Sequence, residues 1–159
     1  MAAFQVDATT EGDLLARLEK VDWAAGDDER GRTLYVKRGC VQCHGGSRAV
    51  GPNLAGITKR FGHVDLFRAI AFPNRDVPPR YQTTLVVTTE GTQHAGIVVY
   101  ESVDGLTLRD GENRTFRIEA KEIEARRRSP TSLMPSGLLK DLESSDLADL
   151  EAYLRTLAR

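Results

Sequence analysis

Apolar residues follow a helical period toward both ends of this chain and a period of two in between. Four stretches have apolar residues at helical spacing, and they predict helices at Thr10 to Trp23, Glu29 to about Gly39, Val64 to Phe72, and Ser144 or Ser145 to about Ala158. Thr10 is placed to cap the first helix, and the acidic pair Asp27-Asp28 opens the second. Pro73 closes the third, because proline cannot continue a helix.

From Tyr81 the period changes to two, which predicts strands. Four predicted strands, TTLVVTT, AGIVVYES, LTLRD and RTFRIEA, are joined by tight Gly-containing turns, and KEIEARRRS is predicted as a fifth. Their alternation predicts one buried face, made of Leu85/Val87, Ile97/Val99, Leu106/Leu108 and Phe116/Ile118. Five short strands of this kind suit a small antiparallel β-barrel or a curled β-sheet.

Composition narrows the classes of function. The chain has 159 residues, 40% hydrophobic and 28% charged, with a formal net charge of −1. This balance argues against a nucleic-acid partner, which would require a strongly positive surface. No apolar run has the roughly 18 to 20 residues that span a bilayer, and the opening MAAFQVDATT lacks the features of a secretory signal. If the protein is exported, we therefore expect this sequence to be a mature form or a piece of a longer chain.

The stretch CVQCH, residues 40 to 44, carries both cysteines of the chain and one of its three histidines. Two thiols at this spacing suit addition to the two vinyl groups of a porphyrin, and the adjoining imidazole suits ligation of the iron. The motif therefore predicts covalent attachment of haem c through Cys40 and Cys43, with His44 as the proximal ligand.

Three other uses of the cysteines are less well supported by the sequence. A redox-active dithiol would sit in a βαβ pattern, which is missing around residue 40. A zinc site would have to recruit His63 and His94, which are scattered along the chain rather than closely spaced. A disulfide between Cys40 and Cys43 would close a very short loop and so constrain little.

The sixth iron ligand is predicted to be Met134. Thioether sulfur is the usual second ligand of an electron-carrying haem c, and the chain has only one methionine besides Met1. Met134 lies in the loop SLMPSG, where Pro135 and Gly137 suit the inward presentation of a side chain. His63 and His94 are the alternative donors, although a lone histidine in either setting is more often a surface or core-edge residue.

Other residues are candidates for shaping the haem pocket. Pro52 could pack on the proximal imidazole, and the carbonyl of Gly51 or Pro52 could accept the Nδ1–H of His44. The candidates for contacts with the haem propionates are Arg60, Lys59 and Tyr81, each of which also suits a solvated surface role. The run Arg126-Arg127-Arg128 is expected to be a solvated strand end, with docking of an acidic partner or a propionate as the alternative.

The segments GRTLYVKRGCVQCH, VGPNLAGI, SLMP and DLADLEAYLRTL together resemble class I cytochrome c. More narrowly, the stretch from Phe72 to Val99 and the run RRRSPTSLMPSGLLKDL resemble the Pirellula/Verrucomicrobium-type haem-binding domain. The resemblance implies a mainly α cytochrome c fold in which Gly31 and Tyr35 meet Leu150 and Tyr153 where the first and last helices cross. The inserted strands are similar to an SH3-like or Sm-like barrel.

The resemblance implies three parts: an N-terminal helical extension at 1–26, a haem domain at 27–80 and 130–159, and an inserted β module at 81–129. It also implies one haem c, ligated by His44 and Met134, that passes single electrons without enzymatic turnover. Such domains commonly accept electrons within larger secreted dehydrogenases, so the expected partners are a dehydrogenase donor and a downstream cytochrome or oxidase, and the expected location is periplasmic. The alternative is a haem-based gas or redox sensor, or a peroxidase-like enzyme, with a labile sixth ligand.

Overall fold

The computed structural model describes residues 10–46 and 49–157, and the chain divides into two compact units. The helical unit comprises the residues up to Val41, Asn53–Pro73 and the residues from Pro135 on. The sheet unit comprises Gln42–Pro52 and Asn74–Met134. The boundary between the units passes through a short helix, α3 (Cys40–His44), which carries the haem motif.

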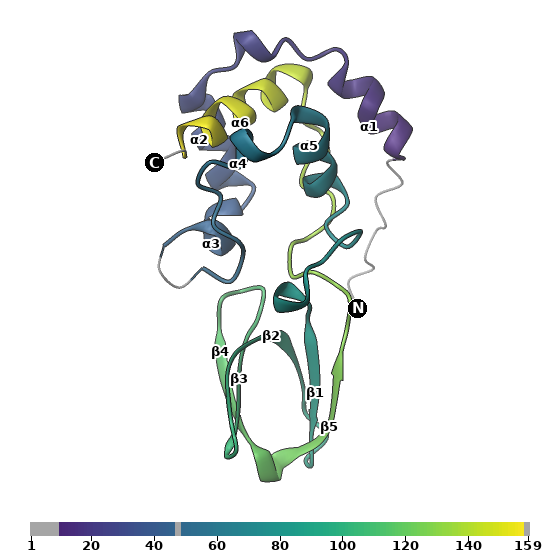
Figure 1. Ribbon diagram of the computed structural model, residues 1–159, viewed down its shortest axis with the longest axis vertical. Coiled ribbons are helices and arrows are strands. Elements are labelled where there is room, and N and C mark those ends of the chain that lie inside the picture. Colours follow the sequence, from purple (N-terminus) through teal and green to yellow (C-terminus); the bar gives the residue numbers. More distant parts are fainter. Residues whose placement is uncertain (1–9, 47–48, 158–159) are drawn as a thin grey trace. The chain divides into compact units, whose positions relative to one another are not determined.

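The remaining helices of the described chain belong mainly to the helical unit (Figure 1). They are α1 (Glu11–Leu18), η1 (Trp23–Ala25), α2 (Asp28–Lys37), α4 (Ile57–Arg60), α5 (His63–Ala71) and α6 (Ser144–Thr156). The predicted helices are confirmed, but the first is shorter than expected and α4 was not predicted. The predicted end of the last helix, Ala158, lies outside the described residues.

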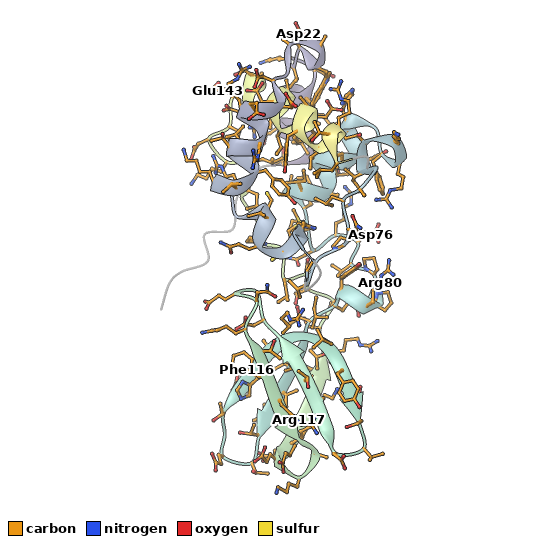
Figure 2. The ribbon with its side chains drawn as sticks, turned by 90° about the vertical axis from the view of Figure 1, so that its left-hand side faces the viewer. Asp22, Asp76, Arg80, Phe116, Arg117 and Glu143 are labelled. Atoms are coloured by element: carbon orange, nitrogen blue, oxygen red, sulfur yellow. The ribbon has the colours of Figure 1, made fainter. Side chains whose placement is uncertain are left out.

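The sequence predicts side-chain caps for α1 and α6, and the structure confirms only the first. Thr10 caps α1 as predicted, accepting a hydrogen bond from the Asp13 backbone N–H while the Asp13 carboxylate accepts from the Thr10 N–H. The prediction that Ser144 or Ser145 caps α6 is wrong. Glu143 is the N-cap residue, and its backbone N–H donates to the Asp146 carboxylate (Figure 2). This reciprocal bonding satisfies helix-end groups that a serine cap would otherwise have satisfied.

Helices α2 and α6 cross at Gly31. A Cβ at this position would lie 1.9 Å from the Asp149 carbonyl oxygen and 2.8 Å from the Tyr153 Cβ, so only glycine allows the two backbones to approach this closely. The Tyr35 and Tyr153 rings pack nearby, with their centroids 5.1 Å apart. Asp149 is buried on α6, where its carboxylate accepts hydrogen bonds from the Arg30 side chain and from the Asp27 backbone N–H. The predicted meeting of Gly31 and Tyr35 with α6 is thus confirmed.

One apolar core holds the helical unit together. Its most buried side chains are Leu14 of α1, Phe67 of α5 and Leu147 of α6, each with no exposed surface. Arg17 of α1 adds two hydrogen bonds to the backbone carbonyls of Leu139 and Leu142, at 3.1 and 2.7 Å. Helix α1 is therefore built into the same core as the helices that flank the haem motif.

The sheet unit contains a five-stranded antiparallel sheet in the order β4-β3-β2-β1-β5. Its strands are β1 (Thr84–Thr88), β2 (Gln93–Ser102), β3 (Gly105–Arg109), β4 (Thr115–Glu119) and β5 (Ile123–Arg128). The expected β-barrel is not formed, because the edge strands β4 and β5 do not pair with each other. Strand β2 pairs with β1 through its first half and with β3 through its second half, so the sheet is bent and open.

The buried face of the sheet differs from the predicted one at two strands. Val86 is fully buried in β1, whereas the predicted Leu85 and Val87 are only partly buried. Val99 is 42% exposed because the register of β2 against β3 shifts between Val98 and Tyr100. A bulge of this kind places an extra residue in one strand and so interrupts the alternation of faces.

The remaining core positions are mostly as predicted. Ile97, Leu106, Leu108 and Ile118 are buried, and Phe116 is partly buried with its ring centroid 5.0 Å from that of His94. Figure 2 labels Phe116 and its neighbour Arg117 on β4. Since successive residues of a strand point to opposite faces, the apolar and the charged residue separate across the sheet.

An ion pair joins two non-adjacent strands of this open sheet. Arg126 of β5 donates two hydrogen bonds to the Glu101 carboxylate of β2, at 2.5 and 3.1 Å. The register places Arg126 opposite the buried Val86 and Glu101 opposite the buried Leu106, so both side chains rise from the core face. This side-chain link connects strands that share no backbone ladder, and it gives Arg126 a partner within the sheet unit.

Candidate haem site

The haem motif forms the short helix α3, which is separated from α2 by a turn of the backbone. Helix α2 ends at Lys37, and Gly39 has a φ of 78°, in the left-handed region that glycine adopts readily. The turn lets the chain restart as α3 at Cys40, so the motif is itself helical rather than the end of the preceding helix. Cys40 and Cys43 are three residues apart in this helix and therefore lie on neighbouring turns.

Both thiols are half-buried, and neither takes part in a disulfide. Burial raises the pKa of the Cys43 thiol above its usual value. The disulfide alternative is thus not formed in this structure. The elements on either side of α3 are helices, and the first strand of the described residues begins only at Thr84, so the dithiol alternative lacks its expected βαβ surroundings. No group of three or more His, Cys, Asp or Glu within residues 10–46 and 49–157 could hold a metal ion, which leaves the zinc alternative without support.

The His44 ring is held by the loop that follows α3. Its Nδ1 lies 2.8 Å from the Pro52 carbonyl oxygen. A carbonyl can only accept a hydrogen bond, so Nδ1 carries a proton, and in the neutral imidazole Nε2 then keeps its lone pair. This is the tautomer that a metal-ligating histidine needs. The hydrogen bond made by the nitrogen that does not bind the metal holds the proton on that nitrogen and fixes the orientation of the ring.

Gly51 leaves room for this ring. A Cβ at residue 51 would lie 2.8 Å from the His44 Cε1 and 3.0 Å from its Nδ1, so any side chain would displace the imidazole. The Gly51 N–H also donates to the Cys43 carbonyl at 2.8 Å, which ties the loop back to α3. The residues present therefore fit a porphyrin held by Cys40 and Cys43, with His44 Nε2 available as a ligand.

Met134 belongs to the sheet unit, as does His44. Its loop is held by hydrogen bonds that the sequence did not reveal. The Met134 N–H donates to the Ser132 hydroxyl at 3.0 Å, and the Ser132 N–H donates to the Asn74 side-chain oxygen at 2.7 Å. Asn74 lies 58 residues before Ser132, and no local pattern could have indicated that contact.

The two alternative histidines have other surroundings. His63 begins α5 in the helical unit, where its ring stacks on Trp23 with centroids 4.1 Å apart, and its Nδ1 lies 3.7 Å from the buried Glu151 carboxylate. His94 lies in β2 against Phe116. Both side chains thus have packing partners of their own, as expected for structural histidines.

The remaining candidates are distributed over both units. Pro52 is exposed, and its carbonyl oxygen is the atom that lies within hydrogen-bonding distance of His44 Nδ1. Arg60 is exposed at the end of α4, with long hydrogen bonds of 3.5 and 3.4 Å to the carbonyls of Asn53 and Ala55. Tyr81 is half-buried at the end of η2 (Pro79–Tyr81) in the sheet unit, beneath the Arg80 guanidinium at 5.0 Å. Asp76 and Arg80, labelled in Figure 2, lie in the segment that leads into β1.

A comparison with protein families agrees with this geometry. A family model described as cytochrome c matches residues 29–98, which include Cys40, Cys43 and His44 and end within β2. Met134 and α6 lie outside the match. No curated protein matches the chain significantly.

The family match supports a class I cytochrome c, a class of haem-binding electron-transfer proteins that work with redox partners. The cofactor is haem c, which is covalently bound and contains iron. Among the described helices, none combines the length and apolar character needed to cross a membrane.

Proposed function

We propose that this protein is a one-electron carrier with a single haem c, bound through Cys40 and Cys43 and ligated by His44 and Met134. The observation that carries the proposal is the hydrogen bond from His44 Nδ1 to the Pro52 carbonyl, because it leaves Nε2 free to bind iron. When bound, the haem supplies a centre that cycles between ferric and ferrous iron. The Pro52 carbonyl fixes the His44 ring, the two cysteines supply the thiols, and Met134 supplies a thioether.

Within this proposal, Arg60 and Tyr81 are available to contact the propionates. Thioether ligation with an apolar surround favours the ferrous state, so we expect a positive reduction potential. The domain is of the Pirellula/Verrucomicrobium type and is divided as residues 27–80 and 130–159 around an inserted β module at 81–129, after a helical extension at 1–26. It accepts electrons from a secreted dehydrogenase and passes them to a downstream cytochrome or oxidase in the periplasm.

The test of attachment and ligation uses intact mass and absorption spectra of the purified protein. We expect a mass increase of one haem that survives acid extraction, and a low-spin spectrum in both oxidation states. Replacement of His44 by Gln is expected to abolish that spectrum, whereas the matched variants His63→Gln and His94→Gln are expected to keep it. A pigment that acid and organic solvent remove completely would refute the proposal.

Carbon monoxide separates an electron carrier from a sensor or peroxidase-like enzyme. Cytochromes c generally act without enzymatic turnover, though some are peroxidases. We expect no change in the ferrous spectrum on adding carbon monoxide, because sulfur from Met134 occupies the sixth position. The variant Met134→Ala is expected to bind the gas at once and so serves as the positive control. Rapid binding by the unaltered protein would instead support the sensor or enzyme.

Export is tested by adding or withholding a secretory signal. Thioether bonds to haem are made outside the cytoplasm in bacteria, and cytochrome c domains are typically exported. We expect covalent haem only in protein sent to the periplasm, and equal haem attachment in both compartments would contradict a periplasmic location.

A further inference from the structure

The loop that carries Met134 is tied down by a chain of hydrogen bonds within the sheet unit. Ser132 stands at its centre: its hydroxyl accepts from the Met134 N–H at 3.0 Å, and its own N–H donates to the Asn74 side-chain oxygen at 2.7 Å. Met134 is thus connected to a residue of the segment between α5 and β1.

A second set of bonds closes the base of the same loop. Both the N–H and the hydroxyl of Thr83 donate to the Thr131 carbonyl at 2.9 Å, and the Ser129 N–H donates to the Thr83 carbonyl at 2.7 Å. Thr83 is only 8% exposed, so these bonds are shielded from competing water. The chain is therefore pinned at Thr131 and Ser132, directly before Met134.

The residue after Met134 restricts it further. A residue that precedes proline is confined to extended backbone conformations, and Pro135 imposes this on Met134. The bonded residues and the proline together leave the Met134 backbone few conformations. Ordering a free residue costs conformational entropy, so a loop that is already ordered loses less entropy when its methionine binds a ligand.

We infer that Asn74 and Ser132 are positioning residues for the sixth ligand: they hold the Met134 loop in one conformation, in which the methionine would supply its sulfur to a bound haem. The inference rests on the proposed ligation by Met134. Neither residue touches the iron, and each acts through the Met134 backbone. Asn74 sits in the sequence before the β strands and Ser132 after them, so the hydrogen bond also closes the base of the inserted strands.

The variants Asn74→Ala and Ser132→Ala test the inference, because each removes one acceptor and leaves the methionine in place. A net hydrogen bond contributes on the order of 1 kcal/mol, so we expect the population of haem without sulfur bound to rise roughly fivefold. The measurements are the sulfur-to-iron charge-transfer band of the ferric protein and the rate at which cyanide displaces the sulfur. We expect a weaker band and roughly fivefold faster cyanide binding.

Conservative and matched variants separate positioning from a general loss of stability. Asn74→Asp and Ser132→Thr keep the acceptor oxygen and are expected to restore the original cyanide rate. Ser102→Ala is the same substitution at a serine away from the loop, whose hydroxyl lies 3.5 Å from the Gly105 carbonyl oxygen in the turn between β2 and β3, and it is expected to leave the band unchanged. The unfolding midpoint measured by circular dichroism identifies any variant whose whole fold has weakened.

The outcomes distinguish this inference from the proposed function. If the unaltered protein shows no sulfur-to-iron band, ligation by Met134 is wrong and the inference falls with it. If the unaltered protein shows the band and both alanine variants match Ser102→Ala in band and rate, ligation stands and the positioning role is overturned.

Discussion

The two units of this protein differ in the size of their apolar cores. Of the residues that the structure describes, twelve buried apolar residues form one core in the helical unit, and four form the core of the sheet unit. In the sheet unit, polar contacts such as Arg126 with Glu101 and Thr83 with Thr131 add to this smaller core. His44 and Met134 both belong to this less apolar unit, so their loops are held by polar contacts with defined geometry rather than by burial alone.

Because the larger apolar core lies in the helical unit, we expect truncation of a buried side chain there to lower the free energy of unfolding more than any other change. Phe67 of α5 has no exposed surface, and Phe67→Ala is expected to lower the free energy of unfolding by about 4 kcal/mol, through lost burial and the cavity left behind. This loss is measured by unfolding the protein in urea while recording its circular dichroism. The matched variant Val103→Ala removes a side chain that is 93% exposed and is expected to change stability by less than about 0.5 kcal/mol. Equal losses in the two variants would contradict the described core.

A side chain at the helix crossing is expected to have the next largest effect. The Gly31→Ala variant would place its Cβ against the Asp149 carbonyl, which is backbone and cannot move without shifting α6. We expect a loss of about 3 kcal/mol in the same unfolding experiment. Gly62→Ala is the control, because nothing lies within 4 Å of a Cβ there. If Gly31→Ala is as stable as Gly62→Ala, the close crossing of α2 and α6 is wrong.

The variant Asp149→Asn removes the charge of this buried carboxylate and is expected to lower the free energy of unfolding by about 2 kcal/mol near neutral pH. The hydrogen bond from Arg30 lowers the pKa of the Asp149 carboxyl below its ordinary value of 3.8. A lowered pKa means that the stabilisation is complete above the unfolded-state value and is lost as the pH falls through the folded-state value. The stability gap between the unaltered protein and Asp149→Asn should therefore shrink as the pH falls below about 4. Unfolding measured across acid pH checks this, and a gap that stays constant would assign the effect to packing.

Breaking the ion pair of the open sheet is expected to have the smallest effect. The hydrogen bond from Arg126 lowers the pKa of the Glu101 carboxyl, but both side chains remain partly exposed. We expect Glu101→Gln to lower the stability less than any of the changes above, and less still at high salt, because the pair is exposed to solvent and screened. A double-mutant cycle with Arg126→Gln isolates the pair. A coupling energy that does not weaken with salt would show that the pair acts through something other than its charges.

Much of the helical unit could be predicted because its signals are local. The Thr10 cap, the acidic start of α2 and the apolar stripe of α6 each depend on residues within a few positions of one another. The strands were also located correctly from their alternation and turns. The predicted burial was wrong at Val86, which is buried, and at Val99, which is exposed. A bulge and the bending of a sheet depend on which strands pair, and this pairing is not a local property of the sequence.

The sequence alone determined the chemistry of the site: CVQCH specifies two thiols and an imidazole at a spacing that suits a porphyrin, whatever the surroundings. Only the tertiary structure decided that Pro52 sets the tautomer of His44, that Asn74 reaches Ser132, and that the sheet stays open. The reason is physical. Covalent attachment depends on neighbours along the chain, whereas a ring orientation or a loop conformation depends on hydrogen bonds between residues that folding alone brings together.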